Sequence, residues 1–219
     1  MSAGDIRNSE EIIDDLFDRY PLLRACESNV RRAYDMLCSC YGESKKVLVC
    51  GNGGSAADSE HIVGELMKSF KMKRKPDPSF TNSYNAIFSE DPPNWLEGAL
   101  PAISLVSHTA LSTAFSNDES AVGVFAQQVY GYGDRGDVLI AISTSGTSRN
   151  VIEAAKVAQA KRMGVIALMG EADAPLASFA DVAIRVPCTE TFKVQELHLP
   201  VYHALCAAVE AHFFGSVDD

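Results

Sequence analysis

The chain has 219 residues and a formal net charge of −10 at neutral pH, with 19 lysines and arginines against 29 aspartates and glutamates. Its hydrophobic content of 47% is ordinary for a globular protein, and a chain of this length can bury a core without disulfides. The acidic balance argues against nonspecific nucleic-acid binding, which depends on Lys and Arg, and against an anionic membrane surface. It leaves a phosphorylated small molecule open, because backbone N–H groups can hold a phosphate.

Targeting and membrane signals are missing from the sequence. No apolar run reaches the roughly 18–20 residues of a membrane span, and residues 1–20 are polar and acidic, unlike a signal peptide. The six cysteines form no C-x-x-C pair, and several lie in apolar runs, which indicates reduced thiols. We therefore expect a cytoplasmic protein with no membrane or nucleic-acid partner.

The first predicted unit is an N-terminal helical segment, residues 1–42. Apolar side chains recur at helical spacing from residue 8 onward, and Ser9 is a suitable N-cap. Pro21 interrupts the pattern, because proline cannot continue the hydrogen-bond ladder of a helix. We expect two helices here, followed by a single larger domain over residues 43–219.

In the larger domain, short apolar runs alternate with helical patterns. Strands are predicted at residues 46–50, 103–106, 137–142, 164–169 and 181–186. Helices are predicted at about 56–70 and 150–162, and a last helix at 193–214 contains Pro200, which can kink it. Strands that alternate with helices indicate a parallel sheet with helices on both faces, and fully apolar strands fit that burial.

Residues 71–101 break this alternation. They contain five prolines and a middle rich in Asn and Ser, and we expect a long ordered loop or insertion, because a connection of this length is usually functional or disordered. A basic cluster stands where it begins: Lys68, Lys71, Lys73, Arg74 and Lys75. Two interpretations of the cluster stay open, a solvated face or a contact with a phosphate.

Two strand-to-helix turns are rich in glycine and hydroxyl side chains. Residues 51–55 follow the first strand, and residues 143–148, with five hydroxyls in six positions, follow the third. Ligands of open α/β sheets bind at the carboxyl ends of strands, where hydroxyls and N–H groups can cradle a phosphate without positive charge. One such turn is more often a capped loop, but two favour a ligand site.

Two pairs of polar residues share helix faces. His61 and Glu65 are four residues apart on one predicted helix, and Gln195 and His203 are eight apart on the last one. Two imidazoles, a carboxylate and an amide can form a metal site. The spacing equally suits exposed polar pairs, other histidines on the last helix fit as well, and nothing in the spacing shows that the two helices meet.

At these residues the chain resembles the sugar isomerase (SIS) domain family, and more closely its phosphoheptose isomerase branch, which converts sedoheptulose 7-phosphate to a heptose 7-phosphate. The matching stretches, in the family's order, are 51–58 with His61 and Glu65, 116–118, 143–151, and 195–198 with His203 and Glu210. The resemblance implies a flavodoxin-like three-layer α/β/α sandwich. It also implies a homotetramer or homodimer with active sites at subunit interfaces.

Site residues follow from the same resemblance. It implies a Zn²⁺ ion held by His61, Glu65, Gln195 and His203. We expect an aldose–ketose isomerisation through an enediol, with Glu65 as base and His203 as acid, and the assignment of His203 as base stays open. Contacts with a sugar phosphate are implied for Asn52, Gly53, Gly54, Ser55, Asn117, Asp118, Ser143, Thr144, Ser145, Ser148 and Gln195.

The chain departs from the family at three places. Ser69 stands where the family usually has an arginine, Phe192 stands where it has an acidic residue, and the stretch 76–101 is longer than the usual connection. Two other functions therefore stay open. One is a non-catalytic phosphosugar sensor or protein-binding adaptor, and the other is a lyase- or etherase-like activity on amino-sugar phosphates.

Overall fold

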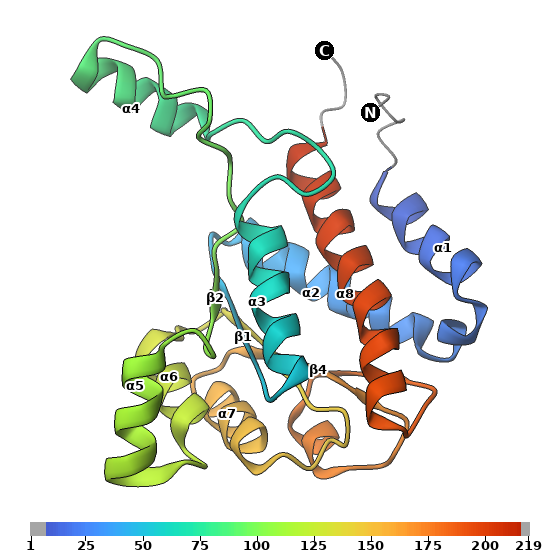
Figure 1. The fold of residues 1–219 in the computed structure, drawn as a ribbon. Coiled ribbons are helices and arrows are strands. Elements are labelled where there is room, and N and C mark those ends of the chain that lie inside the picture. The colour runs from blue at the N-terminus through green and yellow to red at the C-terminus, as the bar shows by residue number, and fades with distance from the viewer. Residues whose placement is uncertain (1–7, 216–219) are drawn as a thin grey trace.

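A computed structural model describes residues 8–215 and contains a five-stranded sheet between layers of helices (Figure 1). The strands are β1 (Val47–Gly51), β2 (Ala102–Ser104), β3 (Val138–Ile142), β4 (Gly164–Gly170) and β5 (Val182–Val186). All neighbours pair in parallel, in the order β2-β1-β3-β4-β5. This is the flavodoxin-like strand order, so the predicted α/β/α sandwich with a parallel central sheet is confirmed.

Helices cover both faces of the sheet. One face carries α1 (Ser9–Arg19), the short helix η1 (Pro21–Cys26), α2 (Glu27–Gly42), α3 (Gly54–Met67) and α8 (Thr191–Phe214). The other face carries α6 (Val124–Tyr132), α7 (Arg149–Ala160) and η3 (Pro175–Phe179). Before α6 the chain forms α5 (Thr109–Phe115) and a π-helical turn, η2 (Ser116–Ser120).

The strands alternate their side chains between two cores. Val47 and Val49 of β1 pack under α3 and α8, whereas Leu48 and Cys50 pack under α6 and α7. Every residue of β1 and β3 is buried, as expected for a strand covered on both faces. The helices α1 and α2 share the first core with the sheet, and the division of the chain at residue 42 stays a prediction.

Three local expectations need correction or refinement. Asn8, not Ser9, is the N-cap of α1, because its side chain accepts from the Glu11 N–H and Glu11 accepts in return, which is a capping box. The helix α8 continues through Pro200 as one element. Residues 71–101 are not only loop, since they contain α4 (Pro78–Phe88).

The cysteines and the helices can be compared with what the sequence predicts about redox state and membrane spans. All six cysteines are free thiols, which agrees with the interpretation from their spacing. Within residues 8–215, none of the helices combines the length and apolar character that crossing a membrane requires.

Candidate active site

The two polar turns lie side by side at the carboxyl edge of the sheet. β1 and β3 are neighbours, with Gly51 opposite Ile142, so the turns that follow them are neighbours too. A reciprocal amide pair joins the turns: Asn52 and Asn150 each donate to the other's oxygen at 2.9 Å. In this fold the chain leaves β1 and β3 in opposite directions, which makes this edge the place where a ligand binds.

Glycine is required where the turns bend most sharply. Gly53 has φ +58° and ψ −121°, a backbone conformation that other residues rarely adopt. Gly146 has φ +66°, and a Cβ there would lie 2.5 Å from the Met169 Cε atom. These glycines bring two helix N-termini to the same edge.

Both of those N-termini lack a side-chain cap. Gly53 and Ser148 are the N-cap residues of α3 and α7, and neither makes a capping side-chain hydrogen bond. The first N–H groups of a helix carry partial positive charge. The Ser55 and Ala56 N–H groups bond to the preceding turn, but no hydrogen bond within residues 8–215 engages the N–H groups of Gly54 in α3 and of Arg149 and Asn150 in α7. Two such N-termini beside hydroxyl side chains form an anion-binding edge without needing a lysine.

The hydroxyl groups of the second turn bond to one another. Ser143 Oγ donates to Ser148 Oγ at 3.0 Å, and the hydroxyls of Ser145 and Thr147 are 2.8 Å apart. A cation that sequence analysis missed stands next to them, because Arg149 is the first residue of α7, is exposed, and forms no ion pair within residues 8–215. Arg149 could have been found from the sequence by its position at the start of the helix after the second turn, because it is not part of the basic cluster.

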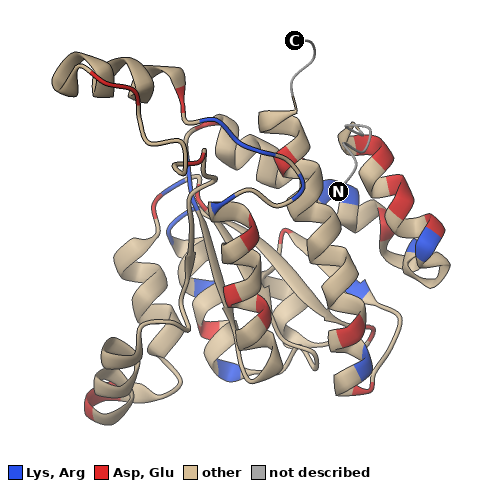
Figure 2. Ribbon diagram, turned by 45° about the horizontal axis from the view of Figure 1, so that its top comes forward, with Lys and Arg blue, Asp and Glu red and all other residues tan. Residues whose placement is uncertain are grey.

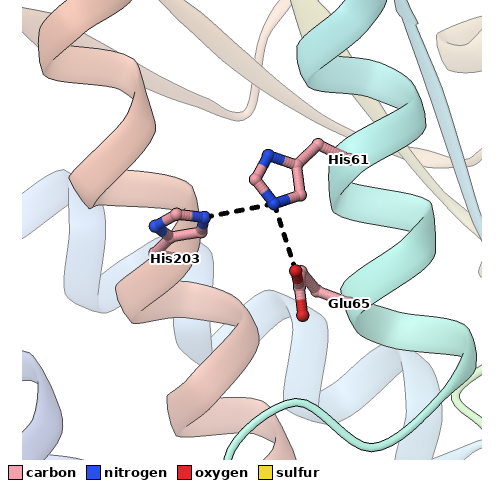
Figure 3. Close-up of side chains that lie close together, drawn as sticks. All are labelled: His61, Glu65 and His203. Carbon is pink, nitrogen blue, oxygen red and sulfur yellow. Dashed lines mark hydrogen bonds and ion pairs between the residues drawn. The ribbon is translucent and has the colours of Figure 1, made fainter.

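A second cluster lies farther along α3, where three side chains converge (Figure 3). His61 and Glu65 point from α3 toward His203 of α8. His61 Nε2 lies 3.1 Å from Glu65 Oε1 and 3.4 Å from His203 Nε2, and one ligand atom from each residue lies within 4.8 Å of the others. The fold therefore brings α3 and α8 together within one chain. Residue spacing in the sequence could not show whether these two helices meet.

A buried tyrosine fixes the orientation of His61. Tyr202 Oη donates to Asp58 Oδ1 at 3.1 Å and lies 3.1 Å from His61 Nδ1, so its oxygen is placed to accept the Nδ1–H of the imidazole. With Nδ1 directed at Tyr202, the Nε2 atom of His61 faces the Glu65 carboxylate and His203 Nε2. Sequence analysis missed both partners, because a tyrosine and an aspartate at these positions resemble packing and surface residues.

This arrangement fits a metal ion. One potential ligand atom from each of the three side chains converges here. The buried Glu65 Oε2 accepts no hydrogen bond within the described residues, and the Lys68 ammonium lies 3.9 Å from it. Buried polar atoms normally have partners, so a cation between the three side chains accounts for the geometry. A histidine whose second nitrogen is held by a hydrogen bond is the usual metal ligand, with nitrogen and oxygen donors that suit zinc.

Burial shifts the pKa of the groups around the cluster. The pKa of His203 is lowered, first by burial and then by the neighbouring His61, so its imidazole is neutral at neutral pH. Burial raises the pKa of Asp58, against the opposing hydrogen bond from Tyr202. Burial, together with Asp58, also raises the pKa of Tyr202 and keeps it a hydrogen-bond donor.

Gln195 lies at the opposite end of the α3–α8 contact from His203. A Cβ on Gly54 would lie 2.5 Å from Gln195 Nε2, so the amide covers the start of α3, beside the turns. His61 is seven residues farther along α3, roughly 10 Å by helical rise. Gln195 is thus placed to contact a ligand of the turns, and its role as a metal ligand stays a prediction.

The remaining predicted contact residues stand apart from the turns. Asn117 and Asp118 are exposed on η2, and the Asn117 amide donates to Asp118 at 2.8 Å. Within residues 8–215, no hydrogen bond or ion pair connects them to the turns or to α3. Asp118 does not cap a helix here, because it lies inside the π-helical turn.

The basic cluster does not form a uniform solvated face. Arg74 is 1% exposed and pairs with Glu210 at 2.7 Å, while Lys73 pairs with Glu97 at 2.6 Å on the surface. The cluster follows the C-terminus of α3, roughly 20 Å of helix away from the polar turns. Within one chain it therefore supplies no charge to the edge formed by the polar turns.

The two positions that depart from the family have local roles. The Ser69 hydroxyl accepts from the Arg74 N–H at 3.1 Å, and the Ser69 N–H donates to Glu97. Phe192 is 55% exposed on the first turn of α8, with the Lys193 ammonium 5.6 Å from its ring centre. Ser69 holds the connecting segment, and Phe192 adds an apolar surface near Gln195.

Comparisons with known proteins agree with this geometry. The family model described as SIS domain matches residues 20–92 and 96–170. The phosphoheptose isomerase of Shewanella denitrificans is 37% identical over 193 residues, which is 87% of each chain. That of Geotalea daltonii is 39% identical over 181 residues, 83% of this chain and 82% of its own.

Solved structures give the same result. The phosphoheptose isomerase of Neisseria gonorrhoeae superposes with a TM-score of 0.70 at 32% identity, covering 92% of this chain and 98% of its own. That of Francisella tularensis gives a TM-score of 0.71 at 28% identity, covering 93% and 98%. Their likeness extends over nearly the whole described chain.

Proposed function

The chain belongs to the SIS domain family and to its phosphoheptose isomerase branch, so it is a phosphosugar isomerase, and we propose that its substrate is sedoheptulose 7-phosphate or a closely related sugar phosphate. The observation that carries the proposal is the distance between two unlike sites on α3. An anion-binding edge lies at its N-terminus, and an acid–base cluster lies roughly 10 Å farther along. An extended sugar phosphate has a charged end and a carbonyl end that suit this separation.

In this proposal the turns bind the phosphate end. The uncapped N–H groups of α3 and α7 and the hydroxyls of the second turn donate to the phosphate oxygens. The contacts are assigned to Asn52, Gly53, Gly54, Ser55, Ser143, Thr144, Ser145 and Ser148. Gln195, above Gly54, then contacts the sugar next to the phosphate.

The cluster is proposed to be a zinc site. His61, Glu65 and His203 would hold the ion. The resemblance adds Gln195 as a fourth ligand, but its side chain lies beside Gly54, so that role stays a prediction. When bound, Zn²⁺ polarises the substrate carbonyl and thereby acidifies the neighbouring C–H. Elemental analysis of the purified protein tests this part, and a metal-free protein whose activity no metal restores would contradict it.

Glu65 and His203 are assigned the proton transfers. In this proposal the Glu65 carboxylate removes the proton from the carbon beside the carbonyl and returns it to the other carbon. His203, held neutral by its lowered pKa, moves the proton between the two sugar oxygens. A positioned acid–base pair of this kind contributes about 10²–10⁴-fold in rate.

Replacing Glu65, the proposed base, tests whether the site can bind the sugar phosphate without isomerising it. Glu65→Gln should reduce turnover by about 10²-fold or more, while thermal shift with the sugar phosphate is retained. Exchange of the substrate C–H proton, followed by NMR, measures the chemical step. Glu60→Gln is the matched control, because Glu60 lies on the same helix but bonds to the Ser107 hydroxyl on the surface.

The outcome also distinguishes the other candidate functions. Retained turnover in Glu65→Gln would overturn the assignment of the base. Wild-type protein that binds a panel of sugar phosphates but exchanges none of their C–H protons would contradict isomerisation and favour a sensor or adaptor. Exchange with amino-sugar phosphates alone would favour the lyase- or etherase-like alternative.

The assembly and location are part of the same proposal. We infer a homotetramer or homodimer acting in the cytoplasm, in which active sites lie at subunit interfaces. The position of Asn117 and Asp118 supports this, since both are exposed and reach no site residue of their own chain within residues 8–215. Sedimentation equilibrium would measure the number of subunits.

A further inference from the structure

The connection after α3 forms an arm that stands out from the body of the protein (Figure 1). The arm comprises residues 76–96, and its helix α4 has no buried residue. Its 11 residues are too few to make an isolated helix stable in water, where about 12–15 are marginal even in alanine-rich sequences. A helix with this length and composition needs a partner surface.

One side of α4 is an apolar stripe. Phe80, Tyr84, Ile87 and Phe88 recur at the spacing of a single helix face. The rings lie next to one another along it in tilted pairs, with centroids 6.0 Å apart for Phe80 and Tyr84 and 4.7 Å apart for Tyr84 and Phe88. Ile87 is 72% exposed, and Trp95 on the returning segment is 73% exposed. The stripe is therefore open and continuous.

The base of the arm is firmly held, so the stripe is presented in a fixed place. The Gly98 N–H donates to the Arg74 carbonyl, and the Leu100 N–H donates to the Leu66 carbonyl at the end of α3. Glu97 accepts from the Ser69 N–H at 2.8 Å. Gly98 has no room for a side chain, because a Cβ would lie 2.6 Å from the Lys75 carbonyl oxygen.

Charge identifies the partner. α4 itself carries no charged residue. The segment leading to it carries the exposed Lys71 and Lys75 before the acidic N-cap Asp77, and the segment leaving it is acidic (Figure 2). Lys75 precedes the helix, and Glu90 and Asp91 follow it, all three exposed and without ion pairs among residues 8–215. An antiparallel pair of such arms places each basic segment beside the acidic segment of the other.

We propose that the arm binds the arm of a second copy of this chain, with the two α4 helices antiparallel about a two-fold axis near Tyr84. The same patch then contacts itself, as in an isologous interface. The exposed aromatic and aliphatic side chains bury on the order of 1,000 Å² in total, which is the lower limit for a specific interface. An uncharged helix offers nothing to the phosphates of a membrane surface or a nucleic acid.

Cysteine cross-linking tests the contact directly. Ser83→Cys lies on the edge of the stripe, whereas the adjacent Asn82→Cys lies on the opposite side of the helix and is the matched control. Mild oxidation of the full chain should give a disulfide-linked dimer for Ser83→Cys and no more than the wild-type background for Asn82→Cys. Equal cross-linking of the two variants, or none in either, would overturn the proposal.

Exchanging the charges at the two ends of α4 tests the antiparallel arrangement independently. Lys75→Glu should reduce the cross-link through position 83 several-fold, and adding Glu90→Lys and Asp91→Lys should restore it. Phe80→Ser with Phe88→Ser should abolish it and leave the urea midpoint of the main fold unchanged, since α4 buries nothing in its own chain. Cross-linking that survives the loss of both phenylalanines would show that the stripe is not the interface.

Discussion

At the scale of single residues, His61 depends on two neighbours that never touch the substrate in our proposal. Tyr202 is 2% exposed, and its hydroxyl bridges Asp58 and His61 Nδ1. The bridge fixes the tautomer and the ring orientation of His61, so that Nε2 faces Glu65 and His203. Partners of this kind usually affect a metal site 10–100-fold.

Removing the Tyr202 hydroxyl should therefore weaken metal binding. We expect Tyr202→Phe to raise the zinc dissociation constant by about 10–100-fold, measured by competition with a chromophoric chelator. Burial of the ring is kept, but Asp58 Oδ1 loses its donor, so we expect a loss of about 1–3 kcal/mol in the free energy of unfolding, and zinc affinity is measured well below the melting transition. Tyr130→Phe, at an exposed position, is the control, and equal zinc affinity in both variants would show that Tyr202 does not position His61.

At the scale of elements, one buried ion pair connects the end of α3 to α8. Arg74 and Glu210 have fully buried side chains, and the guanidinium also donates to the carbonyls of Glu65 and Leu66. The Glu210 carboxylate accepts the N–H groups of Phe70 and Lys71 in addition. The pair thereby sets the position of the helix that carries Glu65 relative to the helix that carries His203.

Breaking this pair should destabilise the whole contact between the two helices. Loss of one partner of a buried pair typically costs about 3–5 kcal/mol, so we expect a loss of that order in the free energy of unfolding of Arg74→Met or Glu210→Gln. The double variant should lose less than the sum of the two single losses, because their effects are coupled. Urea denaturation of all four proteins measures the coupling, and strictly additive losses would contradict it.

The sequence predicted elements better than it predicted contacts. The strand expected at 137–142 is Val138–Ile142, and the helix expected at 193–214 is Thr191–Phe214, because apolar periodicity is a local property. Helix α4 was missed in a stretch rich in proline, serine and asparagine, although Asp77 accepts from the Ser79 N–H as an N-cap and Pro78 follows it. Burial of Arg74 was missed because its partner is 136 residues away.

At the scale of the whole molecule, topology creates the site. The strand order puts β1 beside β3, and only this neighbourhood brings the two polar turns together. The motifs predicted the turns, but the convergence of His61 with His203 depends on how α3 and α8 pack on the sheet. Such long-range contacts cannot be inferred from spacing, since many packings share one local pattern.

Stability of the whole fold should also depend on pH through His198. This residue of α8 is fully buried, and burial lowers its pKa to about 4, from an ordinary value of 6.5. Between these two values the unfolded chain binds the proton and the folded chain does not, so stability is lost as the pH falls through that window. Linkage gives a loss of about 2 kcal/mol between pH 7 and pH 5 from this group.

His198→Leu should remove that part of the pH dependence. We expect urea denaturation of the variant to show a smaller loss of unfolding free energy from pH 7 to pH 5 than the wild type, by about 2 kcal/mol. The quantity compared is the change in unfolding free energy between pH 7 and pH 5 in each protein. A change in packing that lowers stability equally at both pH values therefore cancels. Equal slopes in the two proteins would show that His198 takes up its proton in the folded state.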